Sequence, residues 1–404
     1  MIASRDSIAG VMAKQVFVPD TVGDASARIA ESERTGETLA FIGGGTNLGI
    51  GAPPDRLDLI IRTGNLNRIV EHAPSDQIIA VEAGVTLARL QEVVGAHAQR
   101  LAIDPPLPDR ATIGGIVAAN AFGPLRARYG SVRDLIIGIS IIRADGVIAR
   151  GGGKVVKNVA GFDLPKLMVG SLGTLGMIAT ATFRLHPLPE ISETLLVSHR
   201  SASAVRSLIA EMKQAQLEVS AVAAIAEGNG FDVAVRFEGF RAGVVAQRDR
   251  LSGLLRSGGG CETLDAEGAQ RLWLRHDAIR AGGPLQLKIA ALPSAIEMVS
   301  SSVVPPLLGA MTGAGFVWYP MSGIGFITGT PADDERIAAV IRKSRDMLVK
   351  ARGSLTIEAA PVAVRRLVNM WGDVGGDALS VMQATKQKFD PGRRLAPGRF
   401  AGGI

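Results

Sequence analysis

The stretch Phe41-Ile42-Gly43-Gly44-Gly45-Thr46-Asn47 decides the fold, because it joins a strand-like run to three consecutive glycines. Glycines after a strand bring bare backbone N–H groups close to a phosphate. In a dinucleotide-binding Rossmann unit, a helix would begin at once and hold the pyrophosphate at its N-terminus. Here residues 49–54 contain two glycines and two prolines, so no helix of useful length can begin there. The loop is therefore predicted to bind a diphosphate without a Rossmann turn; the alternative is a plain tight turn.

The composition bounds the class of protein. A chain of 404 residues exceeds the usual size of a single core, which predicts two domains. With 47% hydrophobic and 20% charged residues, it is typical of a soluble globular protein. Nucleic-acid binding would need basic clusters interleaved with stacking rings, whereas aromatic residues make up 4% of the chain and the arginines are dispersed. The net charge of +6 suits an anionic partner such as a phosphate-bearing cofactor or a small carboxylate.

Cysteine and histidine are scarce. Cys261 is the only cysteine and the five histidines are scattered, so the sequence predicts no internal disulfide, no iron–sulfur cluster held by this chain alone, and no metal site. The first ten residues lack a basic segment followed by an apolar core, and the apolar runs are too short to cross a bilayer. We therefore expect a cytoplasmic protein, or one that touches the inner membrane only through a partner.

The chain divides at two prolines in four residues, Pro187 and Pro189, which end the preceding strand. Before them, apolar runs punctuated by Gly and Pro predict strands at 38–42, 57–61 and 78–82, helices at 20–35 and 86–94, and a hairpin over 135–150. After them, strands and helices alternate in an order that resembles two β-α-β-type units, as in a ferredoxin-like sandwich. We therefore expect a separate α+β cap domain over residues 191–374, followed by a helix and a proline-pinned tail over 375–404.

Two further stretches have small residues where a ligand would need space. Residues 104–109 contain three prolines and form a stiff, extended segment. Residues 111–120 follow directly, with two glycines before a run of small side chains that permit close approach of a flat ring or a phosphate. The alternative for residues 111–120 is a buried Ala/Gly helix packed tightly on its neighbour.

A third glycine-rich region spans residues 151–178. Gly151-Gly152-Gly153-Lys154 is not a P-loop, because Val155 stands where the Mg²⁺-binding hydroxyl should be and the spacing to an earlier glycine is wrong. Glycines recur at 170, 173 and 176, before a strand predicted at 177–185. The residues between them are apolar, which favours backbone near a ligand over a flexible linker.

The order of these stretches resembles the FAD-binding domain of the vanillyl-alcohol-oxidase/PCMH flavoprotein superfamily: G-G-G-T-N, P-P-x-P-D-x-A-T-I-G-G, S-V-R-D and V-G-S-L-G-T-L-G. Residues 154–178 closely resemble the glycolate oxidase (glycolate dehydrogenase) E subunit and its paralogous D subunit. The tail 388–399 is similar to the family's D-P-x-x-x-x-x-P-G-R pattern. This resemblance implies an α+β fold: a two-subdomain PCMH-type FAD-binding domain over residues 1–190, on which residues 375–404 pack back, and a ferredoxin-like cap.

The resemblance also implies which residues contact FAD. The first segment would hold the pyrophosphate with backbone amides, the second would line the diphosphate and approach the isoalloxazine, and the third would contact the adenosine half. In chain order they are Gly43, Gly44, Gly45, Thr46 and Asn47; Pro106, Asp109, Ala111, Thr112, Gly114 and Gly115; and Gly173, Gly176 and Ile178. Relatives that attach FAD covalently through this loop carry histidine or another nucleophile at position 46. Because a threonine hydroxyl is unactivated, we expect non-covalent FAD.

The chain departs from the family in its second half. D-type relatives carry a histidine-rich motif resembling H-x-G-D-G-N near substrate and flavin, and the sequence has nothing like it. His276 is the only histidine after residue 200. One interpretation is a surface helix in which Trp273 packs inward and His276 is partly solvated. The other is a general base beside the flavin, oriented by Asp277, with Arg275 or Arg280 binding a carboxylate.

This departure favours the E type over the D type. Oxidation of a 2-hydroxy acid needs a base for the hydroxyl proton and a cation for the carboxylate. We therefore expect an FAD-binding subunit whose partners, a D-type flavoprotein and an iron–sulfur subunit, hold the substrate site and the electron relay. The alternatives are a self-sufficient FAD-dependent 2-hydroxy-acid dehydrogenase, a flavin-free scaffold subunit, and, more remotely, an NADPH-dependent flavin reductase.

Overall fold

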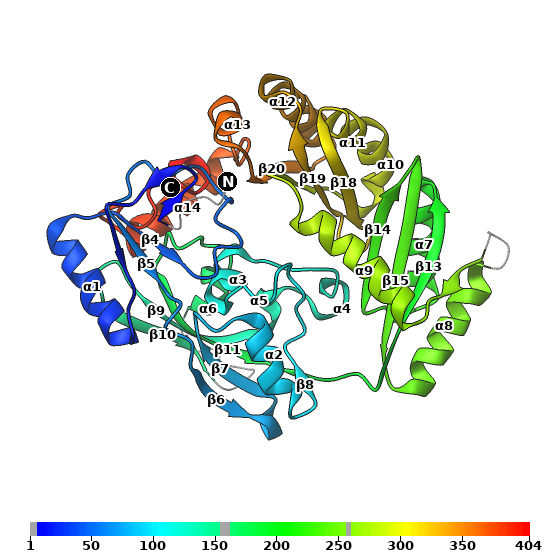
Figure 1. Cartoon of the computed structure of the whole chain (residues 1–404), viewed down its shortest axis with the longest axis horizontal. Helices are drawn as coiled ribbons and strands as arrows, with labels where there is room; N and C mark the ends of the chain where they lie inside the picture. The colour runs from blue at the N-terminus through cyan, green and yellow to red at the C-terminus, as the bar shows by residue number, and fades with distance from the viewer. Residues whose placement is uncertain (1–5, 154–161, 256–259) are drawn as a thin grey trace. The chain divides into compact units, whose positions relative to one another are not determined.

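The computed structural model describes residues 6–153, 162–255 and 260–404, which fold as two units (Figure 1). The first unit comprises Met1–Gly123, Gly130–Pro187 and Asp373–Ile404. The second comprises Pro124–Tyr129 and Leu188–Gly372. The end of the chain thus returns to the unit in which the chain begins.

The first unit contains two main sheets. Three strands pair in parallel in the order β3-β5-β4, and β4 and β5 are buried apolar runs, as parallel strands usually are. Five strands form an antiparallel sheet in the order β10-β9-β11-β7-β6, while β1-β2 and β8-β12 are small pairs. The strands are β1 Ser7–Ile8, β2 Val11–Met12, β3 Gln15–Phe17, β4 Leu39–Ile42, β5 Leu59–Arg62, β6 Ile69–Ala73, β7 Ile78–Glu82, β8 Gln99–Arg100, β9 Ile136–Ile142, β10 Ile148–Gly152, β11 Met177–Arg184 and β12 His186–Pro187.

Local caps set the helix ends of this unit. Thr21 and Asp24 form a capping box before α1, which ends at Gly36 in the left-handed conformation (φ +70°). Thr86 caps α2 by accepting a hydrogen bond from the backbone N–H of Arg89, which confirms the predicted start of that helix. The helices of the unit are α1 Val22–Thr35, α2 Leu87–Gly95, α3 Ile113–Ala119, α5 Val132–Leu135, α6 Leu164–Met168 and α14 Gly376–Phe389.

The C-terminal tail extends the parallel sheet. The backbone N–H of Leu39 in β4 donates to the carbonyl of Arg394 (2.9 Å), and the N–H of Ala396 donates to the carbonyl of Leu39 (2.7 Å). Leu395 lies between these bonds, opposite Leu39 and fully buried. The tail therefore runs parallel to β4, the strand that leads into the triple glycine.

The second unit is built from two similar halves. In each half, strand, helix, two strands, helix and strand follow in the βαββαβ order of a ferredoxin-like fold. All eight strands form one antiparallel sheet in the order β16-β13-β15-β14-β18-β19-β17-β20. The second strand of each half, β14 and β18, meet at the centre, so the two halves are joined there (Figure 1). The predicted α+β architecture is confirmed.

The sequence pattern predicts strands at 194–198, 219–226, 231–237, 285–291 and 323–328 and helices at 201–215, 241–256 and 332–351, and the structure has an element of the predicted type at each. Strands β16, β18 and β20 and several short helices were not predicted. The strands are β13 Ile191–Arg200, β14 Ala221–Glu227, β15 Gly230–Gly239, β16 Glu262–Thr263, β17 Leu285–Ala290, β18 Met311–Tyr319, β19 Ile324–Pro331 and β20 Ser354–Ala359. The α-helices are α4 Arg126–Tyr129, α7 Ala202–Gln214, α8 Arg241–Leu255, α9 Ala266–Ala281, α10 Ile296–Met298, α11 Val304–Leu308, α12 Asp334–Lys350 and α13 Val362–Leu367.

Helix α9 covers one face of this sheet. The main hydrophobic core lies on the other face, where alternate strand residues pack against α7, α8, α11 and α12. Trp273 of α9 donates from Nε1 to Thr194 of β13 in the first half (3.1 Å), and His276 hydrogen-bonds to Tyr319 of β18 in the second half. α9 therefore contacts both halves of the sheet.

Two further properties hold for the part of the chain that the structure describes. None of its helices is long and apolar enough to span a bilayer. Within the same residues, no three His, Cys, Asp or Glu side chains come together as they would around a metal ion.

Candidate functional site

The first two glycines after β4 are packed too tightly for a side chain, and the third has a backbone conformation that favours glycine. A Cβ added to Gly44 would lie 1.6 Å from the carbonyl oxygen of Arg110, and one added to Gly43 would lie 2.0 Å from Oγ1 of Thr112. Gly45 has φ +74°, which L side chains rarely adopt. The backbone of this loop is therefore bare because the segment 110–112 lies directly against it.

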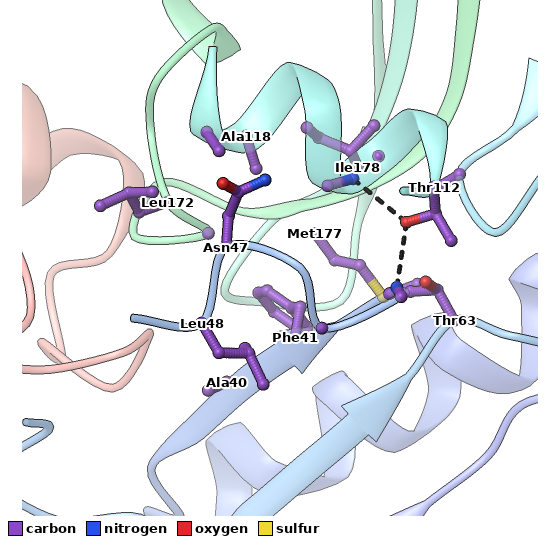
Figure 2. Close-up of a pocket in the computed structure, with 18 of the residues that line it drawn as sticks. Ala40, Phe41, Asn47, Leu48, Thr63, Thr112, Ala118, Leu172, Met177 and Ile178 are labelled. Carbon is purple, nitrogen blue, oxygen red and sulfur yellow. Dashed lines mark hydrogen bonds between the residues drawn. The ribbon is translucent and has the colours of Figure 1, made fainter. Parts of the chain in front are cut away.

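Helix α3 forms the opposite wall, beginning at Thr112 as its N-cap. The hydroxyl of Thr112 accepts hydrogen bonds from the backbone N–H of Gly44 (3.3 Å) and from that of Gly115 (3.4 Å), as the dashed lines in Figure 2 show. A Cβ on Gly114 would lie 2.7 Å from Cβ of Ala83, so the helix is tightly packed as well. The alternative interpretation of residues 111–120 as a close-packed small-residue helix is therefore confirmed, and the helix also borders a pocket; the approach of a ligand there stays a prediction.

The loop 170–176 forms a third wall and is hydrogen-bonded to the end of α3. The N–H groups of Gly170 and Leu172 donate to the carbonyls of Val117 and Ala118, both at 2.9 Å. Leu172 (φ +51°) and Gly173 (φ +76°) both have left-handed backbones. A leucine in that conformation is strained, which is more common at ligand sites than elsewhere.

These three walls enclose one pocket, which eleven of the fourteen predicted residues line. They are Gly43, Gly44, Gly45, Thr46, Asn47, Thr112, Gly114, Gly115, Gly173, Gly176 and Ile178. Of the other three, Asp109 lines an adjoining pocket that shares Gly43, Gly44 and Thr112 with the first. Pro106 and Ala111 line neither pocket, and Ala111 is buried against the core.

Sequence reasoning missed the remaining lining residues. Most of them are apolar side chains beside the quoted glycines, and two belong to the C-terminal tail. They are Ile8, Ala40, Phe41, Leu48, Thr63, Ala83, Ala118, Ala119, Leu172, Met177, Ala396 and Arg399. Figure 2 shows several of these together with Asn47 and Thr112 around the pocket. Most of these residues could have been found from their position in the sequence, because they lie next to the recognised motifs.

The pocket suits a ligand with flat apolar parts and a phosphate-bearing part. Phe41, Leu48 and Met177 supply apolar surface, while the glycine segments supply backbone without side-chain obstruction. Beside the pocket, Oγ of Ser171 and Oδ1 of Asn120 are buried and have no hydrogen-bond partner among the described residues. Buried polar atoms without a partner are rare in native proteins and indicate a missing ligand or water. The residues present therefore fit a dinucleotide such as FAD.

Position 46 bears on how such a cofactor is held. Oγ1 of Thr46 accepts a hydrogen bond from Nδ2 of the neighbouring Asn47 (3.2 Å). An amide donor does not activate a hydroxyl as a nucleophile, because activation needs a base that removes the proton. The expectation of non-covalent binding stays a prediction.

His276 is not the partly solvated surface residue of the first interpretation. Its side chain is 2% exposed, because α9 presses it against β18. Nδ1 donates to Asp277 (2.8 Å), and the hydroxyl of Tyr319 donates to Nε2 (2.8 Å). Burial lowers the pKa of His276 below its ordinary value, against the opposing effect of Asp277, so the imidazole is neutral near pH 7.

The two arginines near His276 are also engaged within the second unit. Arg275 forms ion pairs with Asp232 (2.9 Å) and Glu227 (2.5 Å). The guanidinium of Arg280 lies 3.2 Å from the ring centroid of Phe326. The candidate base and its candidate carboxylate-binding arginines therefore each have partners within the second unit.

Residues 13–152 match the family model described as "FAD binding domain". The chain contains an FAD-binding domain. FAD is accordingly the cofactor of this chain, and its placement in the pocket stays a prediction. The part of the glycolate-oxidase-like stretch at residues 154–161 lies outside the described residues, whereas Phe162 to Ile178 is described.

Curated relatives match over part or most of the chain. The glycolate oxidase subunit GlcE of Escherichia coli (strain K12) is 35% identical over 46% of this chain and 52% of its own length. The subunit GlcD of Bacillus subtilis (strain 168) is 34% identical over 43% of this chain and 37% of its own. The chain thus spans about half or less of these relatives. The D-2-hydroxyglutarate dehydrogenase of Xanthomonas citri pv. viticola (strain LMG 965 / NCPPB 2475 / ICMP 3867 / CFBP 7660) is 24% identical over 95% of this chain and 88% of its own length.

Among solved structures, p-cresol methylhydroxylase with substrate bound superposes with a TM-score of 0.76 at 14% sequence identity. The superposition covers 97% of this chain and 89% of that one. Similarity at this level of identity concerns the fold alone. The fold is therefore the PCMH-type FAD-binding fold, as the sequence motifs predicted.

Proposed function

We propose that this protein is the FAD-binding, E-type subunit of a glycolate oxidase complex. The complex oxidises a 2-hydroxy acid, glycolate or D-lactate, to the 2-oxo acid and passes electrons through flavin to a partner. The 35% identity to a GlcE subunit supports this assignment, as does the absence from the sequence of an H-x-G-D-G-N motif. The partners would be a D-type flavoprotein and an iron–sulfur subunit, with membrane contact only through them.

The observation that carries an FAD-dependent oxidoreductase function is the pocket between the glycine loop, α3 and the loop 170–176. Bound FAD would supply a two-electron acceptor that amino-acid side chains lack. We assign the pyrophosphate to the loop 43–47, in which the N–H of Gly44 already donates to Thr112, and the adenosine half to Gly173, Gly176 and Ile178. The N-cap Thr112, with Gly114 and Gly115, would position the loop toward the isoalloxazine. Backbone donors and small side chains bind the cofactor but move no proton of a substrate.

The absence of a recognised base supports the subunit role. Removal of a hydride from a 2-hydroxy acid requires a base at the hydroxyl. Both ring nitrogens of His276 are hydrogen-bonded: Nδ1 lies 2.8 Å from Oδ1 of Asp277, and Nε2 lies 2.8 Å from the hydroxyl oxygen of Tyr319. A base held in that way serves packing, so a partner subunit would bind the substrate and accept its proton.

A second candidate function is a self-sufficient 2-hydroxy-acid dehydrogenase. The similarity to a D-2-hydroxyglutarate dehydrogenase favours it, because that similarity covers 95% of this chain, second unit included. This similarity, at 24% identity, extends beyond the FAD-binding domain, but it does not indicate which side chain would act as the base.

One experiment separates these functions. The purified chain is loaded with FAD and assayed with glycolate, D-lactate and D-2-hydroxyglutarate and an artificial dye, alone and with co-expressed D-type and iron–sulfur subunits. We expect bound flavin, no turnover alone, and turnover in the complex that depends on this chain. Turnover by the isolated chain would establish the second candidate. Absence of flavin absorbance after incubation with FAD would instead identify a flavin-free scaffold subunit.

A further inference from the structure

The C-terminal segment, residues 386–399, contains a buried ion pair that serves no purpose in the proposed reaction. Nζ of Lys386 lies 2.7 Å from Oδ2 of Asp390, and their side chains are 4% and 0% exposed. Lys386 also donates to the carbonyls of Thr174 and Leu395, both at 2.8 Å. An ammonium group has three donors, so every donor of Lys386 is used.

Asp390 is equally well satisfied. Its carboxylate accepts from the backbone N–H of Leu395 (2.7 Å) and of Arg394 (3.1 Å), in addition to Lys386. A buried ion pair is tolerable only when its remaining donors and acceptors are paired in this way. The arrangement therefore fixes the turn at residues 390–395 against α14.

The same ion pair fixes one wall of the cofactor pocket. Thr174, which accepts from Lys386, is 2% exposed and lies between the pocket-lining Gly173 and Gly176. The carbonyl of Thr174 is thus held by a side chain that does not itself line the pocket.

A second anchor reaches another wall. The guanidinium of Arg399 donates to the carbonyls of Leu48 (3.2 Å), Ile50 (2.5 Å) and Ala52 (3.4 Å), just after the glycine loop. Arg399 is 4% exposed and lines the pocket. Between the two anchors, residues 394–396 pair with Leu39 of β4, the strand that leads into the loop.

We propose that residues 386–399 are a clasp that assembles the FAD pocket, so that docking of this segment and binding of FAD are coupled. The clasp joins two walls that lie more than 120 residues apart in the chain, the loop after Gly45 and the loop 170–176. FAD that contacts both walls binds best when both are in place. By linkage, FAD stabilises the docked clasp by the same factor by which the docked clasp strengthens FAD binding. The inference depends on FAD occupying this pocket, whatever the substrate of the complex.

The test measures FAD affinity by flavin fluorescence titration of the full chain. Lys386→Met keeps the length of the side chain but leaves Asp390 without its cation, and we expect FAD to bind about 5- to 150-fold more weakly. The double variant Lys386→Met/Asp390→Asn removes the unpaired charge but still lacks the hydrogen bond to the Thr174 carbonyl, so only part of the loss should be restored. The matched control is Lys388→Met: this exposed side chain on the same helix makes none of the clasp contacts described above, so the variant should bind FAD as the wild type does.

A second measurement uses the unmodified protein and does not depend on the folding of any variant. Hydrogen exchange of residues 386–399 is followed with and without FAD, and FAD should slow it. Unchanged exchange would overturn the coupling. So would wild-type FAD affinity in both Lys386→Met and Arg399→Gln.

The pocket assignment is checked separately with Gly44→Val. If this variant keeps its flavin, FAD lies elsewhere and the clasp proposal fails with the assignment. If Gly44→Val folds as the wild type does but loses flavin, while Lys386→Met and Arg399→Gln keep it at wild-type affinity, the pocket is correct and only the clasp is wrong.

Discussion

The pocket of the first unit and helix α9 of the second unit differ in the residues that they present. The pocket is lined by glycine segments and small or apolar side chains, and among its described lining residues Arg399 alone is charged. In the second unit, His276 and Arg275 are surrounded by partners from neighbouring strands. In this chain, the polar groups around the buried histidine are satisfied by the protein itself, whereas the segments of small residues line an open pocket. Occupied donors and acceptors stabilise a fold, whereas bare ones remain available for a ligand.

The largest effect is expected from a change in the glycine loop of the first unit. Gly44→Val should abolish FAD retention, because even a Cβ would lie 1.6 Å from the carbonyl oxygen of Arg110. Flavin absorbance per purified chain measures this. Gly95→Val is the matched control, since a Cβ at Gly95 meets nothing within 4 Å. Full flavin content in Gly44→Val would show that the loop does not hold the cofactor.

The second prediction concerns the network in the other unit. His276→Ala should lower the free energy of unfolding by about 2–4 kcal/mol, because it leaves a cavity and removes two buried hydrogen bonds. FAD content should stay at the wild-type level. Chemical denaturation with a flavin assay gives both quantities, and Tyr319→Phe should reproduce part of the loss of stability. A large loss of complex activity in a stably folded His276→Ala chain would give this histidine a catalytic role.

A smaller effect is expected at the N-cap of α3. Thr112→Ala removes the acceptor for the N–H groups of Gly44 and Gly115, so the loop should lose order and FAD should bind about fivefold more weakly, a cost of about 1 kcal/mol. Titration with FAD measures the change. Thr112→Ser retains the hydroxyl and should bind normally; equal weakening in both variants would assign the effect to the lost methyl group instead.

The smallest effect is a pH dependence of stability. The pKa of His276 is lowered by burial in the folded protein, so below about pH 6.5 the unfolded chain binds a proton that the folded chain does not. The free energy of unfolding should therefore fall as the pH decreases from 7.5 to 5.5, by at most about 1.4 kcal/mol per pH unit from this residue. Denaturation curves of wild type and His276→Gln should differ in that slope. Identical slopes would mean that the imidazole titrates equally in both states.

Glycine positions were the part of the site most easily predicted from sequence. Where two backbone segments approach too closely for a side chain, the sequence must contain glycine. Gly43 and Gly44 are such positions, and they can be recognised from the sequence alone. What the sequence could not show is the cause, Thr112 and the preceding carbonyl of Arg110, because these residues are brought against the loop only by the tertiary fold. The fold class was predictable from the order of the motifs, because each motif is a short contiguous stretch that can be recognised without knowledge of long-range contacts.

Burial of individual polar side chains was not predictable. His276 lies on a helix with a weakly amphipathic pattern, so its exposure is decided by β18, which is more than 30 residues further along the chain. Likewise, the tail motif indicated that residues 388–399 belong with the first domain, but not that Arg399 would bind three carbonyls beside the glycine loop. Such contacts depend on long-range geometry that leaves no periodicity in the sequence.

The contact of α9 with both halves of the eight-stranded sheet has a consequence for how that unit unfolds. Strands β14 and β18 meet through two residue pairs, against seven between β14 and its hairpin partner β15. If backbone pairing alone held the two halves together, they would separate first at this boundary between β14 and β18, here called the seam. Trp273 and His276 tie α9 to opposite sides of the seam, so side chains provide the cohesion that the ladder lacks. The two copies of a small fold should therefore melt in a single cooperative transition.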